Sequence, residues 1–169
     1  MRTVEIDRHA CAITKEALTA FRAVVISGAR QSGKTTLLGQ IAGDGGVMRT
    51  FDDIVELDAA LRDPTTYARQ LPNGASVDEF QRAGEPFLLA VKQRLDRDRT
   101  RGQLLLAGST SFLTSKRVAD SLAGRVAIVE LWPFSVGEIE GRRERFIDDV
   151  FERPEGMAQR SSQSPIRWS

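Results

Sequence analysis

The sequence predicts an α/β fold in which a five-stranded, mainly parallel sheet carries helices on both faces, giving three layers. Two observations predict it. Extended apolar segments alternate with helical segments along most of the chain, and the runs over 23–26 and 104–107 are continuously apolar, as in strands buried on both faces. In addition, a glycine-rich loop at 28–35 lies between the first strand and a helix.

The first elements are a helix, a strand and a second helix. Apolar residues recur at helical spacing over 10–22, and a branched apolar run follows over 23–27. The helix after the loop is expected over 36–42, where Gly43 ends it. A second strand is expected over 47–51.

The middle of the chain is expected to hold two helices and a third strand. The first helix covers 54–62 and ends at Asp63-Pro64, and a shorter one covers 65–71. The strand that follows begins near residue 75 and ends at the acidic pair Asp78-Glu79. It is short of branched apolar residues, so its strand signal is weak.

The last elements repeat the alternation. Glu85-Pro86 begins a helix that runs to about residue 99, because proline is favoured in a first helical turn. Ser135 is a candidate cap for the final helix. The expected elements are strands over 103–107 and 126–131 and helices over 116–122 and 136–141.

The loop Gly28-Ala29-Arg30-Gln31-Ser32-Gly33-Lys34-Thr35 matches G-x-x-x-x-G-K-[ST], the phosphate-binding P-loop. Its glycines allow a sharp turn with no side chain between the backbone N–H groups and the phosphates. The helix that follows directs its positive end at the anion. Lys34 is expected to reach the β- and γ-phosphates, and Thr35 to bind Mg²⁺. The residues expected to contact the nucleotide are Gly28, Ala29, Arg30, Gln31, Ser32, Gly33, Lys34, Thr35 and Thr36.

Asp78-Glu79 is interpreted as a Walker B element, because acids at the carboxyl end of a parallel strand lie where such sheets bind ligands. Asp78 is expected to hold the Mg²⁺ shell, and Glu79 to act as general base on the attacking water. The alternative is an exposed acidic pair in a turn.

Two further residues are candidates for catalysis. Ser109, with Thr110 as second choice, follows an apolar strand and is expected to sense the γ-phosphate; the alternative is an ordinary helix cap. Arg125 is a candidate arginine finger in its own chain or a neighbouring one, and the latter requires self-association. Its alternative is an ion pair with a surface carboxylate.

Composition limits the possible classes of protein. The 24 basic and 23 acidic residues nearly balance, so charge gives no reason to expect nucleic acid or an anionic membrane as partner. One cysteine excludes an intrachain disulfide. No leader is recognisable at the N-terminus, and no apolar run approaches the length of a membrane span. We therefore expect a cytoplasmic protein.

Several segments together resemble the AAA-like P-loop ATPases of bacteria and archaea, which usually carry a C-terminal domain of unknown function. The most specific are Asp-Glu-x-Gln-Arg-Ala at 78–83 and the segment from Ser-Leu-Ala-Gly-Arg at 121–125 to Trp-Pro-Phe-Ser at 132–135. The resemblance covers about residues 10–141 and implies ATP and Mg²⁺ as ligands. It places Lys34, Thr35, Asp78 and Glu79 in the roles given above.

The resemblance also predicts the domain organisation. Residues 1–141 form the ATPase domain, and 142–169 form a polar tail that we expect to be poorly ordered. Members of the family usually continue into a second domain, so the chain is interpreted as a truncated copy.

Three functions follow as hypotheses. The first is an Mg²⁺-dependent ATPase. The second is a nucleotide-binding remnant without turnover, and the third a small-molecule kinase in which Asp52-Asp53 holds a substrate hydroxyl. The sequence indicates no protein or DNA partner.

Overall fold

A computed structural model of the chain describes residues 8–43, 45–109 and 122–141. Within them, one five-stranded sheet forms the middle layer, with the strand order β2-β3-β4-β1-β5. All neighbouring strands pair in parallel. The strands are Ala23–Gly28 (β1), Met48–Thr50 (β2), Ala75–Asp78 (β3), Leu104–Gly108 (β4) and Val126–Leu131 (β5).

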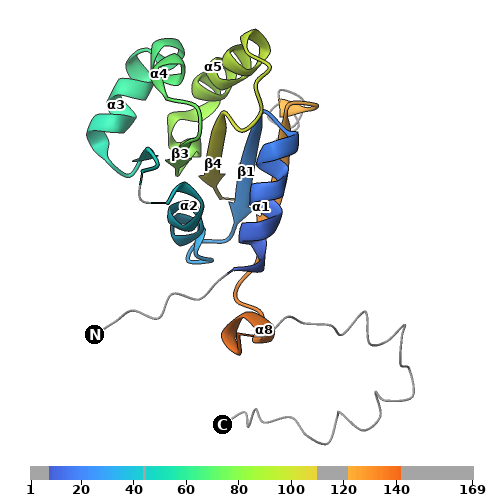
Figure 1. The fold of residues 1–169 in the computed structure, drawn as a ribbon. Helices are drawn as coiled ribbons and strands as arrows, with labels where there is room; N and C mark the ends of the chain where they lie inside the picture. Colours follow the sequence, from blue (N-terminus) through green and yellow to red (C-terminus); the bar gives the residue numbers. More distant parts are fainter. Residues whose placement is uncertain (1–7, 44, 110–121, 142–169) are drawn as a thin grey trace, which may run out of the picture.

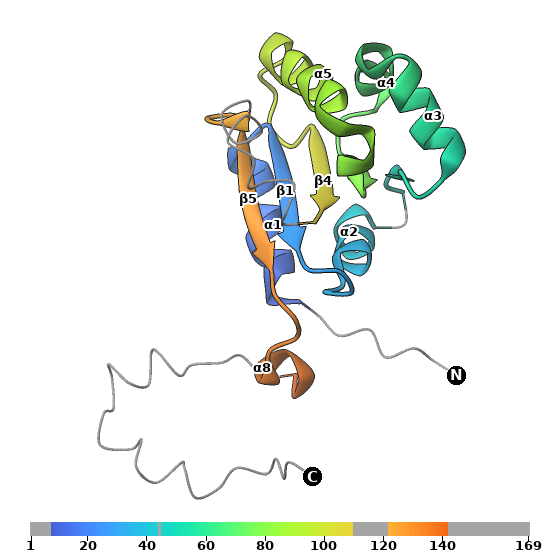
Figure 2. The ribbon, with the colours of Figure 1, turned by 180° about the vertical axis from the view of Figure 1, so that it is seen from behind.

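Helices cover both faces of the sheet (Figures 1 and 2). Two helices, α1 and α2, lie on one face, and α3, α4 and α5 lie on the other. The helices are His9–Ala20 (α1), Lys34–Ala42 (α2), Ile54–Arg62 (α3), Pro64–Gln70 (α4), Gly84–Arg97 (α5) and Val136–Ile139 (α8), with a 3₁₀ turn at Phe80–Ala83 (η1). The predicted three-layer α/β fold is confirmed.

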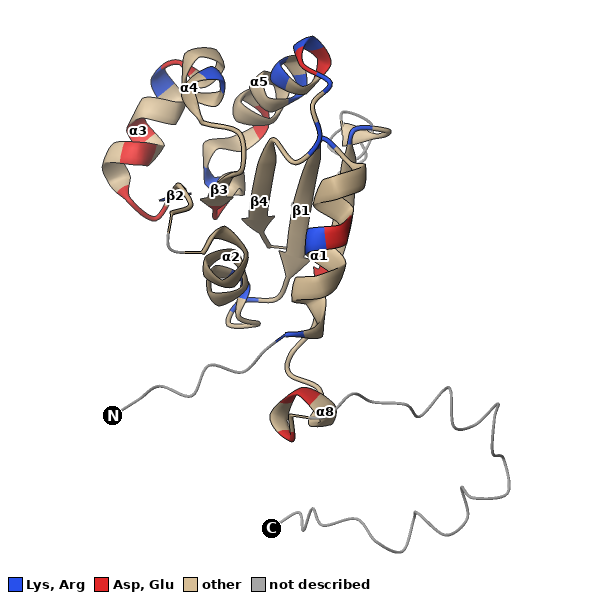
Figure 3. Cartoon of the chain, viewed as in Figure 1, with Lys and Arg blue, Asp and Glu red and all other residues tan. Residues whose placement is uncertain are grey.

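The two faces of the sheet each have their own core. Val24 and Ile26 of β1 pack with Leu37 and Leu38 of α2, whereas Val25 belongs to the core on the opposite face, with α5. Alternating side chains of one strand therefore enter two different cores. This is why the strands are continuously apolar over 23–26 in β1 and 104–107 in β4. Figure 3 shows the charged residues on the outer helices and loops.

The boundaries differ from the predicted ones by one or two residues in most elements. Helix α2 begins at Lys34, two residues earlier than expected, because Gly33 serves as its N-cap in a left-handed conformation. Helix α3 has the predicted bounds. Ser135 caps α8 as expected, in a capping box completed by Glu138. The helix predicted over 116–122 and the tail predicted over 142–169 lie almost entirely outside the described residues.

The register of the sheet decides which loops meet. Ala23 of β1 pairs with Leu104 and Val126, and Ser27 pairs with Gly108 and Glu130. The loops that follow β1, β3 and β4 therefore lie at one edge of the sheet, and the segments that precede these strands lie at the other. None of the helices in the described parts of the chain is both long and apolar enough to cross a membrane.

Candidate functional site

The P-loop connects β1 to α2 at the carboxyl edge of the sheet. Gly33 has φ +90°, a conformation that a residue with a side chain rarely adopts, so the glycine here is required by the backbone. Gln31 also has a positive φ, of 64°. Helix α2 has no side-chain cap at its N-terminus, and its positive end faces the loop. A loop of this shape presents backbone N–H groups to an anion.

Gly28 is required for a different reason from the one that the sequence suggests. Its φ is not in the left-handed region, but a Cβ at this position would lie 2.5 Å from Leu131 O and 2.7 Å from Ser32 Oγ. The end of β5 and the loop itself crowd this residue. Any side chain here would displace the loop from the sheet.

Lys34 is buried inside its own loop. Its Nζ donates hydrogen bonds to Gly28 O at 3.1 Å and Ala29 O at 2.8 Å. Both acceptors are neutral carbonyl groups. Within the described residues, no carboxylate forms an ion pair with the Lys34 ammonium. The buried Ser32 Oγ, in the same loop, has no hydrogen-bond partner in the described part of the chain. A buried cation and an unsatisfied hydroxyl fit a phosphate group as ligand.

Thr35 and Asp78 meet across two elements. Thr35 Oγ1, in the first turn of α2, donates a 2.5 Å hydrogen bond to Asp78 Oδ2 at the end of β3. Asp78 is 3% exposed, and its Oδ1 accepts from the N–H of Glu79 at 2.9 Å. A hydroxyl and a carboxylate are the oxygen donors that Mg²⁺ prefers. No group of three or more His, Cys, Asp or Glu among the described residues could hold a metal, so Mg²⁺ here would take further ligands from phosphate and water.

Glu79 follows Asp78 in a left-handed conformation, with φ 51°. Gln31 and Glu79 are the two non-glycine residues with positive φ in the described ranges, and both lie at this site. Such conformations are unfavourable for residues with a side chain, and strained residues cluster at functional sites. The carboxylate of Glu79 accepts a 2.5 Å hydrogen bond from Gln81 Nε2, which fixes its orientation.

Gln81 was not singled out from the sequence as a site residue. A Cβ on Gly108 would lie 2.4 Å from Gln81 Oε1 and 2.8 Å from the ring of Phe80, so the glycine makes room for both side chains. Gln81 belongs to the Asp-Glu-x-Gln-Arg-Ala string, which marks it in the sequence. Its spacing from Glu79 does not by itself predict the hydrogen bond between the two side chains.

Ser109 directly follows Gly108, whose register partner Ser27 directly precedes the P-loop. The structure therefore brings Ser109 to the same edge of the sheet as Lys34 and Asp78. It is half-buried there. Thr110, the second choice, lies outside the described residues.

Arg125 is not brought to the P-loop of its own chain. It precedes β5, whose first residue pairs with Ala23, so it lies at the edge opposite Gly28. There its guanidinium bonds both carboxylate oxygens of Asp96, at 2.5 and 3.2 Å. These bonds hold the pKa of Asp96 below its ordinary value. Within its own chain, Arg125 therefore forms an ion pair with a surface carboxylate, which was the alternative to a role as arginine finger.

Arg8 reaches the P-loop from outside every motif. It is 5% exposed, and its Nη1 donates to Ser32 O at 2.7 Å. It also forms an ion pair with Glu138, at 3.1 Å. No local pattern in the sequence indicates these contacts, because 24 and 130 positions separate Arg8 from the two residues.

The carboxylates proposed for a kinase are already engaged. Asp53 caps α3 by accepting from Val55 N at 2.8 Å. Asp52 forms an ion pair with Arg82 at 2.5 Å. Each carboxylate thus has one oxygen, Oδ1, in a contact within the protein.

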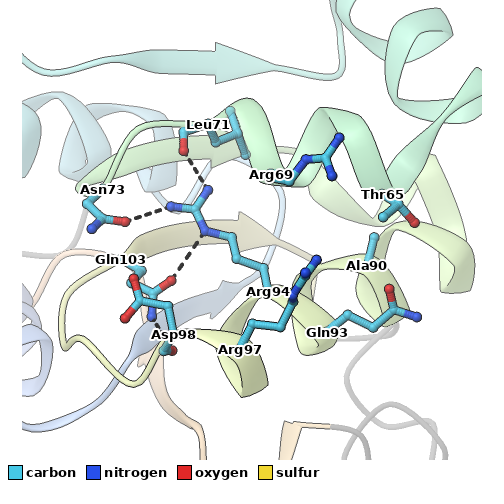
Figure 4. Close-up of a pocket in the computed structure, with 10 residues that line it drawn as sticks. All are labelled: Thr65, Arg69, Leu71, Asn73, Ala90, Gln93, Arg94, Arg97, Asp98 and Gln103. Carbon is cyan, nitrogen blue, oxygen red and sulfur yellow. Dashed lines mark hydrogen bonds between the residues drawn. The ribbon is translucent and has the colours of Figure 1, made fainter.

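A cavity of about 500 Å³ lies away from the P-loop, between α4 and α5 (Figure 4). Arg94 lines it and donates to the carbonyls of Ala68 and Leu71 and to the side chains of Asn73 and Gln103. Burial lowers the pKa of its guanidinium. Arg94 therefore provides hydrogen-bond donors for backbone carbonyls at the carboxyl end of α4 and in the turn that follows it. This is a structural role.

The chain is similar to a known family and to several known proteins. The family of AAA domains matches residues 20–140. Uncharacterized proteins of Mycobacterium bovis and Mycobacterium tuberculosis are each 34% identical over 133 residues, which are 78% of this chain and 30% of theirs. The matched region thus spans under a third of these relatives' length. A solved structure of Caenorhabditis elegans PCH-2 is 16% identical, with a TM-score of 0.45 over 75% of this chain and 41% of that one.

Proposed function

This chain belongs to the family of AAA domains, and on that premise we propose that it binds ATP with Mg²⁺ and hydrolyses it to ADP and phosphate. The family accounts for a nucleotide-binding, ATPase-like domain. The metal dependence, the reaction and the roles of single residues are our proposal.

One observation carries the proposal: the hydrogen bond between Thr35 and Asp78, formed beside the buried Lys34. The hydroxyl and the carboxylate meet in the first turn of α2, next to Lys34 in the chain, at the helix N-terminus that follows the P-loop. A triphosphate with its metal needs this combination of donors and charges.

Each residue has a distinct task in this proposal. The loop and Lys34 bind the phosphates, and Lys34 exchanges its present carbonyl acceptors for phosphate oxygens. Thr35 and Asp78 would hold Mg²⁺, which supplies positive charge to the phosphate oxygens when bound. Glu79, oriented by Gln81, accepts a proton from the attacking water at its carboxylate. In this proposal Ser109 contacts the γ-phosphate.

Arg125 has no task within its own chain in this proposal. If it stabilises phosphate charge, it does so in a neighbouring chain, and turnover per chain should then rise with protein concentration. A turnover number independent of concentration would remove this role.

The test is MgATP binding by calorimetry and phosphate release by the purified chain, beside Lys34→Ala. Lys15→Ala is the matched control, because Lys15 is exposed on α1. We expect both binding and turnover to be lost in Lys34→Ala and retained in the control. Binding without turnover in the unaltered chain would support a nucleotide-binding remnant, and absence of binding would refute the proposal.

A further inference from the structure

Arg8 joins three segments that are far apart in the sequence. Its Nε bonds Glu138 Oε1 at 3.1 Å, its Nη1 bonds Ser32 O at 2.7 Å, and its Nη2 bonds Trp132 O at 2.5 Å. Its guanidinium also lies 4.3 Å from the centre of the Phe134 ring. The start of α1, the P-loop and the segment from β5 to α8 therefore meet at this one side chain.

The carbonyl of Ser32 that Arg8 contacts belongs to the peptide bond between Ser32 and Gly33. A trans peptide is planar, and its C=O and N–H point to opposite sides. Holding the carbonyl of Ser32 on the Arg8 side therefore turns the N–H of Gly33 away from Arg8. The guanidinium is also close to Gly33 itself, since a Cβ there would lie 3.0 Å from Arg8 Nη1.

The buried positive charge of Arg8 is compensated by the carboxylate of Glu138. The two side chains of the Arg8–Glu138 pair are 3% and 6% exposed, so loss of either one leaves a buried charge uncompensated. Glu138 is itself held in place. Its Oε1 also accepts from the N–H of His9 at 2.8 Å, and its Oε2 accepts from the N–H of Ser135 at 3.0 Å.

We propose that Arg8 and Glu138 are a positioning pair for the P-loop: Arg8 fixes the Ser32–Gly33 peptide so that the Gly33 N–H is directed at a bound phosphate, and Glu138 fixes Arg8. The proposal rests on the proposed nucleotide binding and adds to it two residues outside the P-loop and Walker B motifs. Neither residue touches nucleotide, so both act through the loop.

The decisive experiment separates positioning from simple stabilisation. Arg8→Met and Glu138→Met are each expected to lower the melting temperature, because each leaves one buried charge unpaired. The double variant removes both charges and should recover much of that loss. Its dissociation constant for MgADP, measured by calorimetry, should nevertheless stay about tenfold or more above that of the unaltered chain, since the Ser32 carbonyl is no longer held.

The ion pair between Arg62 and Asp58, exposed on α3, provides the matched control. Replacing both of its residues by methionine should change neither the melting temperature nor the dissociation constant. If the Arg8→Met, Glu138→Met double variant regains both stability and full affinity, the pair is merely structural and the proposal is overturned.

Arg8→Lys is the second variant, for the case in which the methionine variants do not fold. An ammonium keeps the charge opposite Glu138 but cannot form the same set of bonds from a planar fork. We expect this variant to fold and to bind MgADP more weakly than the unaltered chain. Full affinity in Arg8→Lys would contradict the proposal.

The backbone gives a readout that needs no nucleotide. In a ¹⁵N-labelled chain, the Gly33 amide resonance should move in Arg8→Lys more than in the Arg62 control, because the peptide is no longer fixed. An unmoved resonance would overturn the positioning role even if the unaltered chain bound no nucleotide. Failure of nucleotide binding alone would refute the proposed function, and the Gly33 resonance would still decide on the pair.

Discussion

Thr35 Oγ1 and Asp78 Oδ2 lie 2.5 Å apart, although 43 positions separate the two residues in the chain. The Thr35 hydroxyl donates this hydrogen bond to the Asp78 carboxylate. In the proposed function Thr35 and Asp78 would hold Mg²⁺, and the hydrogen bond between them would then be lost.

Thr35→Val should remove the benefit of Mg²⁺ for nucleotide binding. The variant keeps the shape of the side chain but lacks the hydroxyl ligand. We expect Mg²⁺ to tighten ADP binding in the unaltered chain and to tighten it much less in the variant, as measured by calorimetry with and without the metal. Thr19→Val, on exposed α1, is the control. Equal metal dependence in both variants would exclude Thr35 as a ligand.

Glu79→Gln should separate binding from turnover. The amide cannot accept the proton of the attacking water, whereas the loop and Lys34 are untouched. We expect the affinity for MgATP to stay within about twofold and phosphate release to fall by about 10²-fold or more. Turnover at the unaltered rate would reject Glu79 as the base, and loss of binding would show that its contact with Gln81 supports the site itself.

Glu138 should make the stability of the domain depend on pH. The backbone N–H groups of Ser135 and His9 and the Arg8 guanidinium lower its pKa below the ordinary value of 4.5, although burial, the largest single influence, acts in the opposite direction. The folded state then binds fewer protons than the unfolded state, so this contribution is present above about pH 4.5 and is lost as pH falls through the lowered pKa.

The measurement is the urea midpoint of the unaltered chain and of Glu138→Gln between about pH 7 and pH 3.5. The variant should be less stable at neutral pH, and the difference between the two chains should shrink with acidification. The lowered pKa values of Asp96 and Asp98 act in both chains and cancel in this difference. A difference that stays constant with pH would contradict the prediction.

Ser76→Ala should stabilise the domain. Ser76 lies in the middle of β3 with 1% exposure, and its Oγ has no hydrogen-bond partner in the described part of the chain. A buried hydroxyl without a partner carries an uncompensated desolvation cost, and its removal creates little empty space. We expect a gain of about 1 kcal/mol in the free energy of unfolding, measured with urea. A loss of stability would mean that the hydroxyl is satisfied in solution.

The fold and the centre of the site were accessible from the sequence because their signals are local or follow from topology. Gly33, Lys34 and Thr35 form one continuous motif. Asp78 was placed beside them by the rule that the carboxyl ends of parallel strands share one edge. Strand β3 formed despite its poor propensity, because β2 and β4 pair with it on both sides and bury it completely.

The same rule explains the position of Arg125. Arg125 precedes its strand, whereas Asp78 and Ser109 follow theirs, so the topology places Arg125 at the opposite edge. Arg8 could not be found in this way, since its contacts with Ser32 and Glu138 depend on how α1 and α8 pack, which no short pattern encodes.

The position of Arg8 also limits how far the domain can be shortened. A chain that began at Ala23 would keep all five strands and the complete P-loop motif, and a motif search would still recognise it. It would lack α1, whose Ala17 and Leu18 pack on the sheet, and the side chain that holds Ser32. On the proposed role of Arg8, the smallest unit that binds nucleotide at full strength should start no later than Arg8, fifteen residues before the first strand.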